Sequence, residues 1–238
     1  MNFKFCFVIP CYNEAENIPS LIFELTKINN KHKDIEFVLV NNGSTDSTQT
    51  LLEDEASNLG FIKYLNISEN KGMGFGIYSG IKLALANNEY NFIGWTHADL
   101  QIPTDTLITA KNIVQQKSSE FKNIYLRGVR KNRHTIIEKI FTALMAIYTT
   151  LIKRGIYWDI TGLPVLVNRD LLNEIIENSP YGFAFDVHTF IKANKYSAKI
   201  IRFPVYFEER KYGESSWNHG FLSKIKMSIY YIKEIYKI

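Results

Sequence analysis

Short apolar runs alternate with helix-like segments through the first half of the chain. Runs rich in β-branched and aromatic residues are typical of buried strands, and they occur at residues 3–10, 35–40, 61–65 and 92–95. After each run come polar residues and then a segment whose apolar positions recur every three or four residues, as at Ile18, Leu21 and Leu25. The helical segments include residues 18–25, 51–56, 78–86 and 107–114. This alternation predicts βαβ units on a mostly parallel sheet.

Four residues indicate where helices begin. Pro19 fits only in a first helical turn, Ser44 and Asp46 are residue types that cap a helix N-terminus, and Pro103 marks a further start. In open α/β sheets the ligand site lies at the carboxyl ends of the strands. We therefore expect the chemistry in the loops that follow the first, second and fourth predicted strands.

The second half of the chain carries two amphipathic segments. Residues 136–152 are helical in pattern, but their uninterrupted apolar stretch has thirteen residues, short of the roughly 20 that a membrane span requires. A basic amphipathic helix is predicted over residues 220–238, where lysines are interleaved with isoleucines and tyrosines. Such helices either lie in a membrane interface or pack on a core with a solvated lysine face, and the pattern leaves both readings open.

The composition is that of an ordinary globular protein. Of the 238 residues, 46% are hydrophobic and 22% are charged, which excludes the disordered and fibrous classes. Cys6 and Cys11 are too close in sequence to staple a fold and are expected to remain thiols in a reducing compartment. The N-terminal residues lack the pattern of a secretory signal, so the predicted location is the cytoplasm.

Charge is distributed unevenly along the chain. Residues 1–100 contain 7 Lys+Arg and 12 Asp+Glu, a net −5, whereas the remainder contains 21 and 12, a net +9. The basic half indicates an anionic partner. Nucleic acid, anionic lipid and a phosphorylated small molecule all fit this requirement, and composition does not choose among them.

Polar motifs stand at the ends of the predicted strands and recur in the second half. The first group is Pro10-Cys11-Tyr12-Asn13-Glu14, Asn41-Asn42-Gly43-Ser44-Thr45-Asp46, Asn70-Lys71-Gly72-Met73-Gly74 and His97-Ala98-Asp99-Leu100-Gln101. The second group is Gly128-Val129-Arg130, Asp159-Ile160-Thr161-Gly162, Phe183-Ala184-Phe185-Asp186 and Arg210-Lys211-Tyr212-Gly213-Glu214-Ser215-Ser216-Trp217. In order and spacing these motifs resemble the inverting family 2 glycosyltransferases, and most closely the dolichyl-phosphate mannosyltransferase-like branch, over nearly the whole chain.

The resemblance implies a fold and a domain organisation. The fold is the GT-A nucleotide-diphospho-sugar transferase fold, a Rossmann-like three-layer α/β/α arrangement with a mostly parallel central sheet. A single GT-A domain would cover residues 1–219, with a nucleotide-sugar-binding half at 1–128 and an acceptor-binding half at 129–219. The basic amphipathic helix at 220–238 would follow it.

The resemblance also implies an activity. A sugar would pass, with inversion, from a nucleotide-diphosphate sugar to a polyprenyl phosphate or a growing surface polysaccharide or lipopolysaccharide, assisted by Mn²⁺ or Mg²⁺. Nucleic acid is not an expected partner, and peripheral contact with the inner face of the cytoplasmic membrane is an open alternative to a purely soluble state. From another class, the alternative is a non-catalytic nucleotide-sugar-binding protein. The sequence does not indicate the sugar, the base or the oligomeric state.

The resemblance assigns roles to individual residues. Donor-binding positions would be Pro10, Tyr12, Glu14, Asn41, Asn42, Ser44, Asp46, Lys71, Gly72, His97, Ala98, Asp99, Ser215 and Trp217. Catalytic positions would be Arg130, Asp159, Asp186 and Arg210. Guanidinium groups such as those of Arg127, Arg130 and Arg210 suit phosphates. A sugar hydroxyl acceptor requires a carboxylate base, for which Asp159 and Asp186 are the candidates, whereas a lipid phosphate is already anionic.

Three residues of one motif are candidate metal ligands. Asp99 stands at the second Asp of the family's DxD motif, and Gln101 matches a neutral oxygen ligand of the branch. His97 replaces the first Asp, which favours Mn²⁺ over Mg²⁺ if the imidazole is a ligand. A hydrogen-bonded histidine outside the ligand set is the alternative.

Two further features leave the donor open. Asn41 and Asn42 replace an Asp pair that contacts the nucleobase and ribose in many relatives. A carboxamide donates as well as accepts hydrogen bonds, so these residues do not indicate which nucleobase the donor carries. The glycine-rich segment at residues 71–76 also suits a dinucleotide. Ile77 stands at the third glycine position, however, and the segment follows the third strand, so a nicotinamide-dependent oxidoreductase is a minor alternative.

Overall fold

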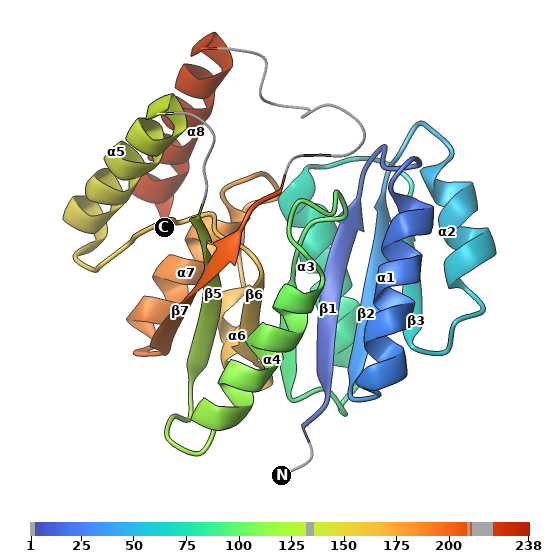
Figure 1. Ribbon diagram of the computed structural model, residues 1–238. Coiled ribbons are helices and arrows are strands. Elements are labelled where there is room, and N and C mark those ends of the chain that lie inside the picture. Colours follow the sequence, from blue (N-terminus) through green and yellow to red (C-terminus); the bar gives the residue numbers. More distant parts are fainter. Residues whose placement is uncertain (1–2, 132–135, 209, 211–220) are drawn as a thin grey trace.

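The fold is built around one seven-stranded sheet. The computed structural model describes residues 3–131, 136–208, 210 and 221–238 (Figure 1). The strands are β1 (Phe5–Cys11), β2 (Ile35–Asn42), β3 (Ile62–Ile67), β4 (Phe92–Trp95), β5 (Ile124–Lys131), β6 (Val165–Asn168) and β7 (Lys199–Tyr206). Their order is β3-β2-β1-β4-β6-β5-β7. Only β6 runs antiparallel to its neighbours, which confirms the prediction of a mostly parallel sheet.

Helices cover both faces of the sheet. They are α1 (Ile18–Lys31), α2 (Thr48–Ala56), α3 (Met73–Ala86), α4 (Asp105–Lys117), α5 (Ile136–Lys153), α6 (Arg169–Ile175), α7 (Phe185–Lys195) and α8 (Phe221–Lys237). Figure 1 shows α1 and α4 in front of the sheet, and α3, α6 and α7 behind it. Helices α5 and α8 pack against each other and extend beyond the sheet (Figure 1).

The predicted helix starts are confirmed in part. Pro19 lies in the first turn of α1, as predicted. Helix α2 begins at Thr48 with Ser47 at the N-cap position, so neither Ser44 nor Asp46 is its N-cap residue. Asp46 nevertheless accepts from the N–H of Thr48, the first residue of the helix. Helix α4 begins at Asp105, two residues after Pro103.

Burial explains the strand sequences. The strands β1 and β2 are continuous apolar runs because helices cover both faces of the parallel sheet, and Phe5, Phe7 and Ile9 have no exposed surface. Helix α3 approaches the sheet closely at Gly80, where an added Cβ would lie 2.4 Å from Val8 Cγ1. In the described part of the chain, no helix is both long and apolar enough to cross a membrane.

Candidate active site

The loops after β1 and β2 are tied to each other. The N–H of Asn13 donates to Ser44 Oγ (3.1 Å), and the Asp46 carboxylate accepts from the N–H groups of Ala15 (3.2 Å) and Thr48 (3.0 Å). Burial acts to raise the pKa of Asp46, but the hydrogen bonds from Thr48 and Ala15 outweigh it and lower that pKa. Ser44 and Asp46 therefore shape the rim of the site through contacts within the protein.

Asn41 and Asn42 make contacts that explain why they are amides. The Asn41 Nδ2 donates to Asn66 Oδ1 (2.7 Å), and its Oδ1 accepts from the Ser44 N–H (3.2 Å). Asn42 Nδ2 donates to the Gly72 carbonyl (3.1 Å), a bond that an aspartate would replace with repulsion. Among the described residues, Asn42 Oδ1 is a buried oxygen without a hydrogen-bond partner. The two amides at the end of β2 thus contact three segments: the loop that follows β2, strand β3 and the start of α3.

The loop before α3 packs on the segment that leads into α7. Gly72 has a φ of 114°, and an added Cβ would lie 2.4 Å from the Tyr181 carbonyl oxygen, so only glycine fits there. The N–H of Phe75 donates to the same carbonyl (2.9 Å). Lys71 is exposed, with its ammonium 5.4 Å from the centre of the Phe75 ring. This packing brings the first and second halves of the chain together.

Asp99 is buried and paired with an arginine. Its Oδ2 accepts from Arg210 Nη2 at 2.7 Å, and its Oδ1 accepts from the Gln101 N–H at 3.2 Å. The Gln101 side chain donates from Nε2 to the Glu208 carbonyl at 3.2 Å. Asp99 lies six residues before α4, so it does not cap that helix.

The side chains around Asp99 fit a hard divalent cation that takes its remaining ligands from the substrate. Asp99 supplies a carboxylate, and Gln101 supplies a neutral amide whose nitrogen donates to the Glu208 carbonyl. Within the described residues, no group of three His, Cys, Asp or Glu side chains forms a complete metal site. Mg²⁺ and Mn²⁺ bind through one or two carboxylates when phosphates and water complete the shell. Asp99 and Gln101 would hold such a cation together with the donor diphosphate.

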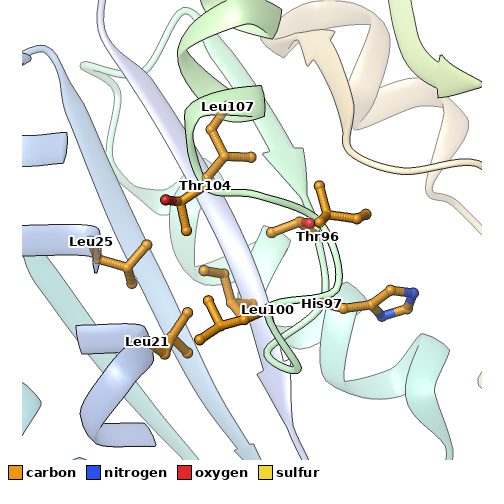
Figure 2. Close-up of a pocket in the computed structure, with 9 residues that line it drawn as sticks. Leu21, Leu25, Thr96, His97, Leu100, Thr104 and Leu107 are labelled. Carbon is orange, nitrogen blue, oxygen red and sulfur yellow. The ribbon is translucent and has the colours of Figure 1, made fainter. Parts of the chain in front are cut away.

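His97 is one of the residues that line a small, mainly aliphatic cavity. The cavity, about 10 Å³, is lined by Ile9, Leu21, Leu25, Thr96, His97, Leu100, Ile102, Thr104 and Leu107. Figure 2 shows the imidazole turned away from Leu21, Leu25 and Leu107. A space of this size holds one water molecule at most, so it is not a donor pocket. The neighbouring Ala98 is buried.

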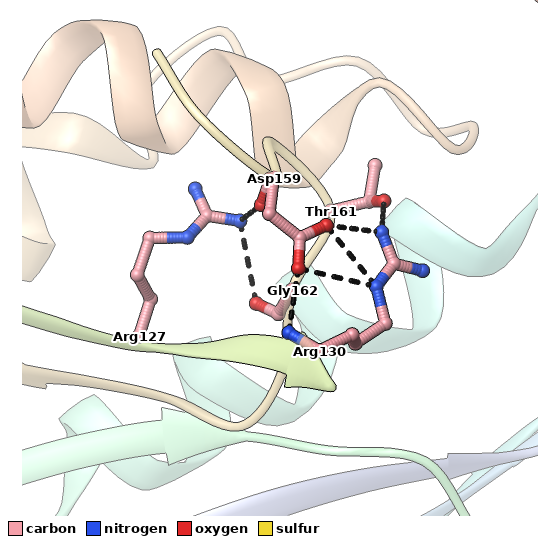
Figure 3. Close-up of polar contacts among 5 residues, drawn as sticks. All are labelled: Arg127, Arg130, Asp159, Thr161 and Gly162. Carbon is pink, nitrogen blue, oxygen red and sulfur yellow. Dashed lines mark hydrogen bonds and ion pairs between the residues drawn. The ribbon is translucent and has the colours of Figure 1, made fainter. Parts of the chain in front are cut away.

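Asp159 and Arg130 form a partly buried ion pair at the end of β5. Arg130 donates to the Asp159 carboxylate from its backbone N–H (2.7 Å), from Nε (3.1 Å) and from Nη2 (2.5 Å) (Figure 3). Nη2 also donates to Thr161 Oγ1 at 2.6 Å. Figure 3 shows the third guanidinium nitrogen pointing away from this network. These hydrogen bonds fix the position of the Arg130 side chain.

Arg127 contacts the backbone carbonyls of the same turn. Its side chain has no exposed surface, and Nη2 donates to the carbonyls of Asp159 (2.6 Å) and Gly162 (3.3 Å) (Figure 3). The guanidinium lies 4.3 Å from the centre of the Phe190 ring, and burial lowers its pKa. A phosphate cannot reach a fully buried guanidinium, so Arg127 acts as a structural residue here.

Asp186 lies in the first turn of α7, beneath the site. Its Oδ1 accepts from Trp95 Nε1 at 2.7 Å, and only 2% of the residue is exposed. Burial raises its pKa, and the Trp95 hydrogen bond and the nearby charges of Arg127 and His97 oppose that rise. Trp95 thus connects β4 to α7.

The remaining predicted residues line the rim or fall outside the described chain. Pro10 is the penultimate residue of β1, and Tyr12 is 38% exposed just beyond it. Glu14 is half-buried, and burial raises its pKa. Ser215 and Trp217 lie outside the described residues.

Sequence reasoning assigned no role to several residues that the structure brings into the site. Thr161 lies inside the motif Asp159-Ile160-Thr161-Gly162, two residues after Asp159, and this position was the available signal. Trp95 ends the predicted strand 92–95, and Asn66 directly follows the predicted strand 61–65, near the ligand edge of the sheet. Glu208 acts through its backbone carbonyl, which no side-chain motif signals.

Comparison with known proteins identifies the family. Residues 6–162, about two thirds of the chain, match the family model described as Glycosyl transferase family 2. The chain belongs to glycosyl transferase family 2. This membership replaces the oxidoreductase alternative, and the loops described above are those of a glycosyltransferase.

Curated family members match the chain over part of its length. Poly-beta-1,6-N-acetyl-D-glucosamine synthase of Staphylococcus aureus (strain COL) is 29% identical over 99 residues, which cover 42% of this chain and 22% of the synthase. The synthase from strain N315 aligns with the same figures. The alignment therefore spans less than a quarter of the length of these relatives.

Solved glycosyltransferase structures share the fold. Glucosyl-3-phosphoglycerate synthase from Mycobacterium tuberculosis, in complex with Mn²⁺, UDP and glucosyl-3-phosphoglycerate, has a TM-score of 0.69 at 14% identity, covering 97% of this chain and 77% of that one. The mannosyltransferase PcManGT from Pyrobaculum calidifontis, in complex with GDP-Man and Mn²⁺, has a TM-score of 0.61 at 18% identity, covering 88% and 58%. The predicted GT-A fold is confirmed.

Proposed function

We propose that this glycosyltransferase moves a sugar, with inversion, from a nucleotide-diphosphate sugar to an acceptor phosphate, as in the dolichyl-phosphate mannosyltransferase-like branch. The observation that supports this is the state of the two candidate bases. Asp159 is held by Arg130, and Asp186 is buried against Trp95. A phosphate acceptor is already anionic and needs no strong base. A positioned Arg130 therefore suits a phosphate acceptor better than it suits a hydroxyl acceptor.

Donor binding is assigned to the loops of residues 1–128. The rim residues Tyr12, Glu14 and Lys71 would contact the nucleotide and its phosphates, with Asn41 and Asn42 shaping the base pocket. Asp99 and Gln101, with His97 nearby, would hold the divalent cation, which offsets negative charge on the departing diphosphate. Several solved neighbours contain Mn²⁺ or Mg²⁺ with a nucleotide or nucleotide sugar, which supports this assignment.

Acceptor binding is assigned to residues 129–219, where Arg130 supplies positive charge and Arg210 lies against Asp99 of the donor side. In the single displacement of an inverting transferase, the acceptor oxygen attacks the anomeric carbon on the face opposite the diphosphate. Arg130 would orient the acceptor phosphate for that attack, and Asp159 would keep Arg130 in place. A positioned ion pair of this kind lowers the barrier mainly through orientation.

Helices α5 and α8 would bring the enzyme to a polyprenyl phosphate in an anionic membrane. Ile140, Leu144, Ile147 and Leu151 form an exposed apolar row on α5, between 51% and 73% exposed. Helix α8 adds exposed Ile229, Ile232 and Tyr236, with Lys233 and Lys237 around a cleft of about 380 Å³ shared with Tyr148 of α5. Lysines beside an apolar surface suit an anionic leaflet.

A growing glycan is the second candidate acceptor. It is favoured by the alignment with the poly-beta-1,6-N-acetyl-D-glucosamine synthases. A hydroxyl acceptor would require Asp186, or Asp159 released from Arg130, to act as the base.

One assay separates these candidates. Purified full-length protein is incubated with UDP- and GDP-sugars in Mn²⁺ or Mg²⁺, with a short-chain polyprenyl phosphate, a glycan oligosaccharide or no acceptor. We expect glycosyl transfer to the polyprenyl phosphate, with an inverted anomeric centre by NMR. Transfer to the oligosaccharide alone would select the glycan acceptor, and binding without turnover would select the non-catalytic alternative.

A further inference from the structure

The carboxylate proposed to hold the metal is already paired with a cation of the chain itself. Arg210 Nη2 lies 2.7 Å from Asp99 Oδ2, and the two side chains are 24% and 6% exposed. A divalent cation and a guanidinium both seek the same carboxylate lone pairs. Arg210 therefore stands where it competes for Asp99.

Hydrogen bonds also join the chain before Arg210 to the loop that carries Asp99. The Glu208 N–H donates to the Gln101 carbonyl (2.8 Å), and the Gln101 side chain donates to the Glu208 carbonyl (3.2 Å). These reciprocal bonds fasten the chain two residues before Arg210 to a point two residues after Asp99. The ion pair thus lies beside the place where the segment after β7 meets the loop after β4.

A second carboxylate shares the charge of Arg210. Burial raises the pKa of Glu14, and a hydrogen bond from Asn17 Nδ2 (2.6 Å) lowers it. The charge of Asp99 raises this pKa and the charge of Arg210 lowers it. Glu14 and Asp99 therefore lie within each other's electrostatic reach, with Arg210 acting on both. Without Arg210 the two acids would repel each other and attract a cation.

We propose that Arg210 is an internal counter-ion that competes with the divalent cation for Asp99, so that the cation binds well only together with the donor diphosphate. This inference rests on the proposed metal role of Asp99. The diphosphate offers the guanidinium another anionic partner as it leaves Asp99, and it adds phosphate oxygens to the cation. Cation and donor then favour each other's binding, a coupling that is reciprocal by thermodynamic necessity.

The test is a direct measurement of Mn²⁺ binding in the absence of donor. Free Mn²⁺ is followed by EPR during titration of the full-length chain and of Arg210→Met and Arg210→Gln. We expect both variants to bind Mn²⁺ at least about tenfold more tightly than the wild type, since removal of a partly buried partner leaves Asp99 uncompensated. Thermal melting of each variant checks that it is folded, and either folded variant suffices for the test.

A matched control separates competition at Asp99 from a general change of charge. Arg202→Met removes the same charge from β7, where Arg202 donates to the Ile156 carbonyl, and it is expected to leave Mn²⁺ affinity unchanged. Adding Asp99→Asn to Arg210→Met is expected to abolish the gain. A gain that persists in the double variant would place the cation elsewhere and overturn the proposal.

The result distinguishes this inference from the proposed function. If Arg210→Met and Arg210→Gln bind Mn²⁺ no more tightly than the wild type, the proposed competition for Asp99 is refuted. The proposed transfer activity is tested separately, by the acceptor assay on the wild type. An equal gain in Arg202→Met would also overturn the competition, because the effect would then be one of net charge.

Discussion

Asp159 adopts a backbone φ of 46°, an unusual conformation for a residue with a side chain, and its carboxylate is bound to Arg130 through the backbone and the guanidinium. Strained residues of this kind persist where surrounding contacts over-determine them, and they cluster at functional sites. The Arg127 and Thr161 contacts supply that support. At the scale of single residues, the second half of the site consists of positioned arginines and the acids that hold them.

The role of Asp159 is tested by Asp159→Asn. If Asp159 positions Arg130, we expect the acceptor KM to rise by at least about tenfold, because a charge-assisted pair is replaced by a neutral one. The pH profile of kcat/KM should keep its shape. Loss of the acidic limb of that profile would instead identify Asp159 as the base. Asp170→Asn, an exposed change on α6, serves as the matched control.

The role of Asp99 is tested by Asp99→Asn. Loss of the proposed ligand should remove several kcal/mol of leaving-group stabilisation, so transfer should fall by at least about a hundredfold. An asparagine still accepts from the Gln101 N–H but loses the ion pair with Arg210, so we expect a lower melting temperature in a variant that still folds, and thermal melting checks this. Turnover near the wild-type rate in this variant would refute the assignment, and Asp105→Asn on the exposed start of α4 is the control.

At the scale of elements, α5 and α8 differ from the other helices. The helices on the sheet bury their apolar faces in the core, whereas the row from Ile140 to Leu151 on α5 is exposed. Its members are spaced by four, three and four residues, which places them on one helical face. Burial of each such side chain in an apolar phase contributes about 1.5–3 kcal/mol.

Membrane contact is tested by the double variant Leu144→Asp and Leu151→Asp. Full-length wild type should co-sediment with anionic vesicles at low salt and lose this binding at high salt, because lysine contacts are screened within about 10 Å at 0.1 M. The double variant should remain in the supernatant under both conditions. Phe23→Asp, at a 63% exposed position of α1, should bind like the wild type.

Failure of the wild type to bind anionic vesicles at low salt would contradict membrane contact. The growing glycan would then be the favoured acceptor. Binding that survives in the double variant would show that the α5 row does not enter the lipid.

At the scale of the whole molecule, the acidic and basic halves of the sequence meet across one sheet. Residues 1–100 carry the net −5 and the remainder the net +9. Asp99 from the first part pairs with Arg210 from the second. The candidate site therefore lies where the two charge distributions meet, which suits a ligand that carries both an anionic diphosphate and a divalent cation.

The stability of the whole molecule should depend on His188. This histidine is 4% exposed on α7, and among the described residues its Nε2 lacks a hydrogen-bond partner. Burial lowers its pKa from 6.5 to about 4. The unfolded chain therefore takes up the proton first, and the free energy of unfolding falls as pH drops from about 6.5 towards 4, by about 2 kcal/mol at pH 5.

The measurement is urea unfolding at pH 7.5 and at pH 5 for the wild type and His188→Asn. The variant should lose about 2 kcal/mol less between the two pH values, since it has no imidazole to protonate. An equal loss in both proteins would show that other groups account for the acid sensitivity.

Local pattern was enough to predict the strands and helices of the first half, the two amphipathic helices of the second half and the edge of the sheet that carries the site. It did not predict β5, β6, β7, α6 or α7. These predictions depend on side chains that are close in sequence. They are the apolar patterns of the strands, the proline in the first turn of α1 and the motifs after β1, β2 and β4. Parallel strands bring their carboxyl ends to one edge, so these motifs were expected to meet. Asp99 and Gln101 lie in one of these motifs, and the family resemblance singled them out as candidate metal ligands.

Only the tertiary structure decided which of these side chains are engaged. The Arg210–Asp99 pair joins residues 111 positions apart, and the Arg130–Asp159 pair joins residues 29 apart. Arg127 resembles a phosphate-binding residue in sequence, but β5 lies between β6 and β7 and its arginine is buried. Contacts between segments distant along the chain depend on strand order and packing, which local periodicity does not encode.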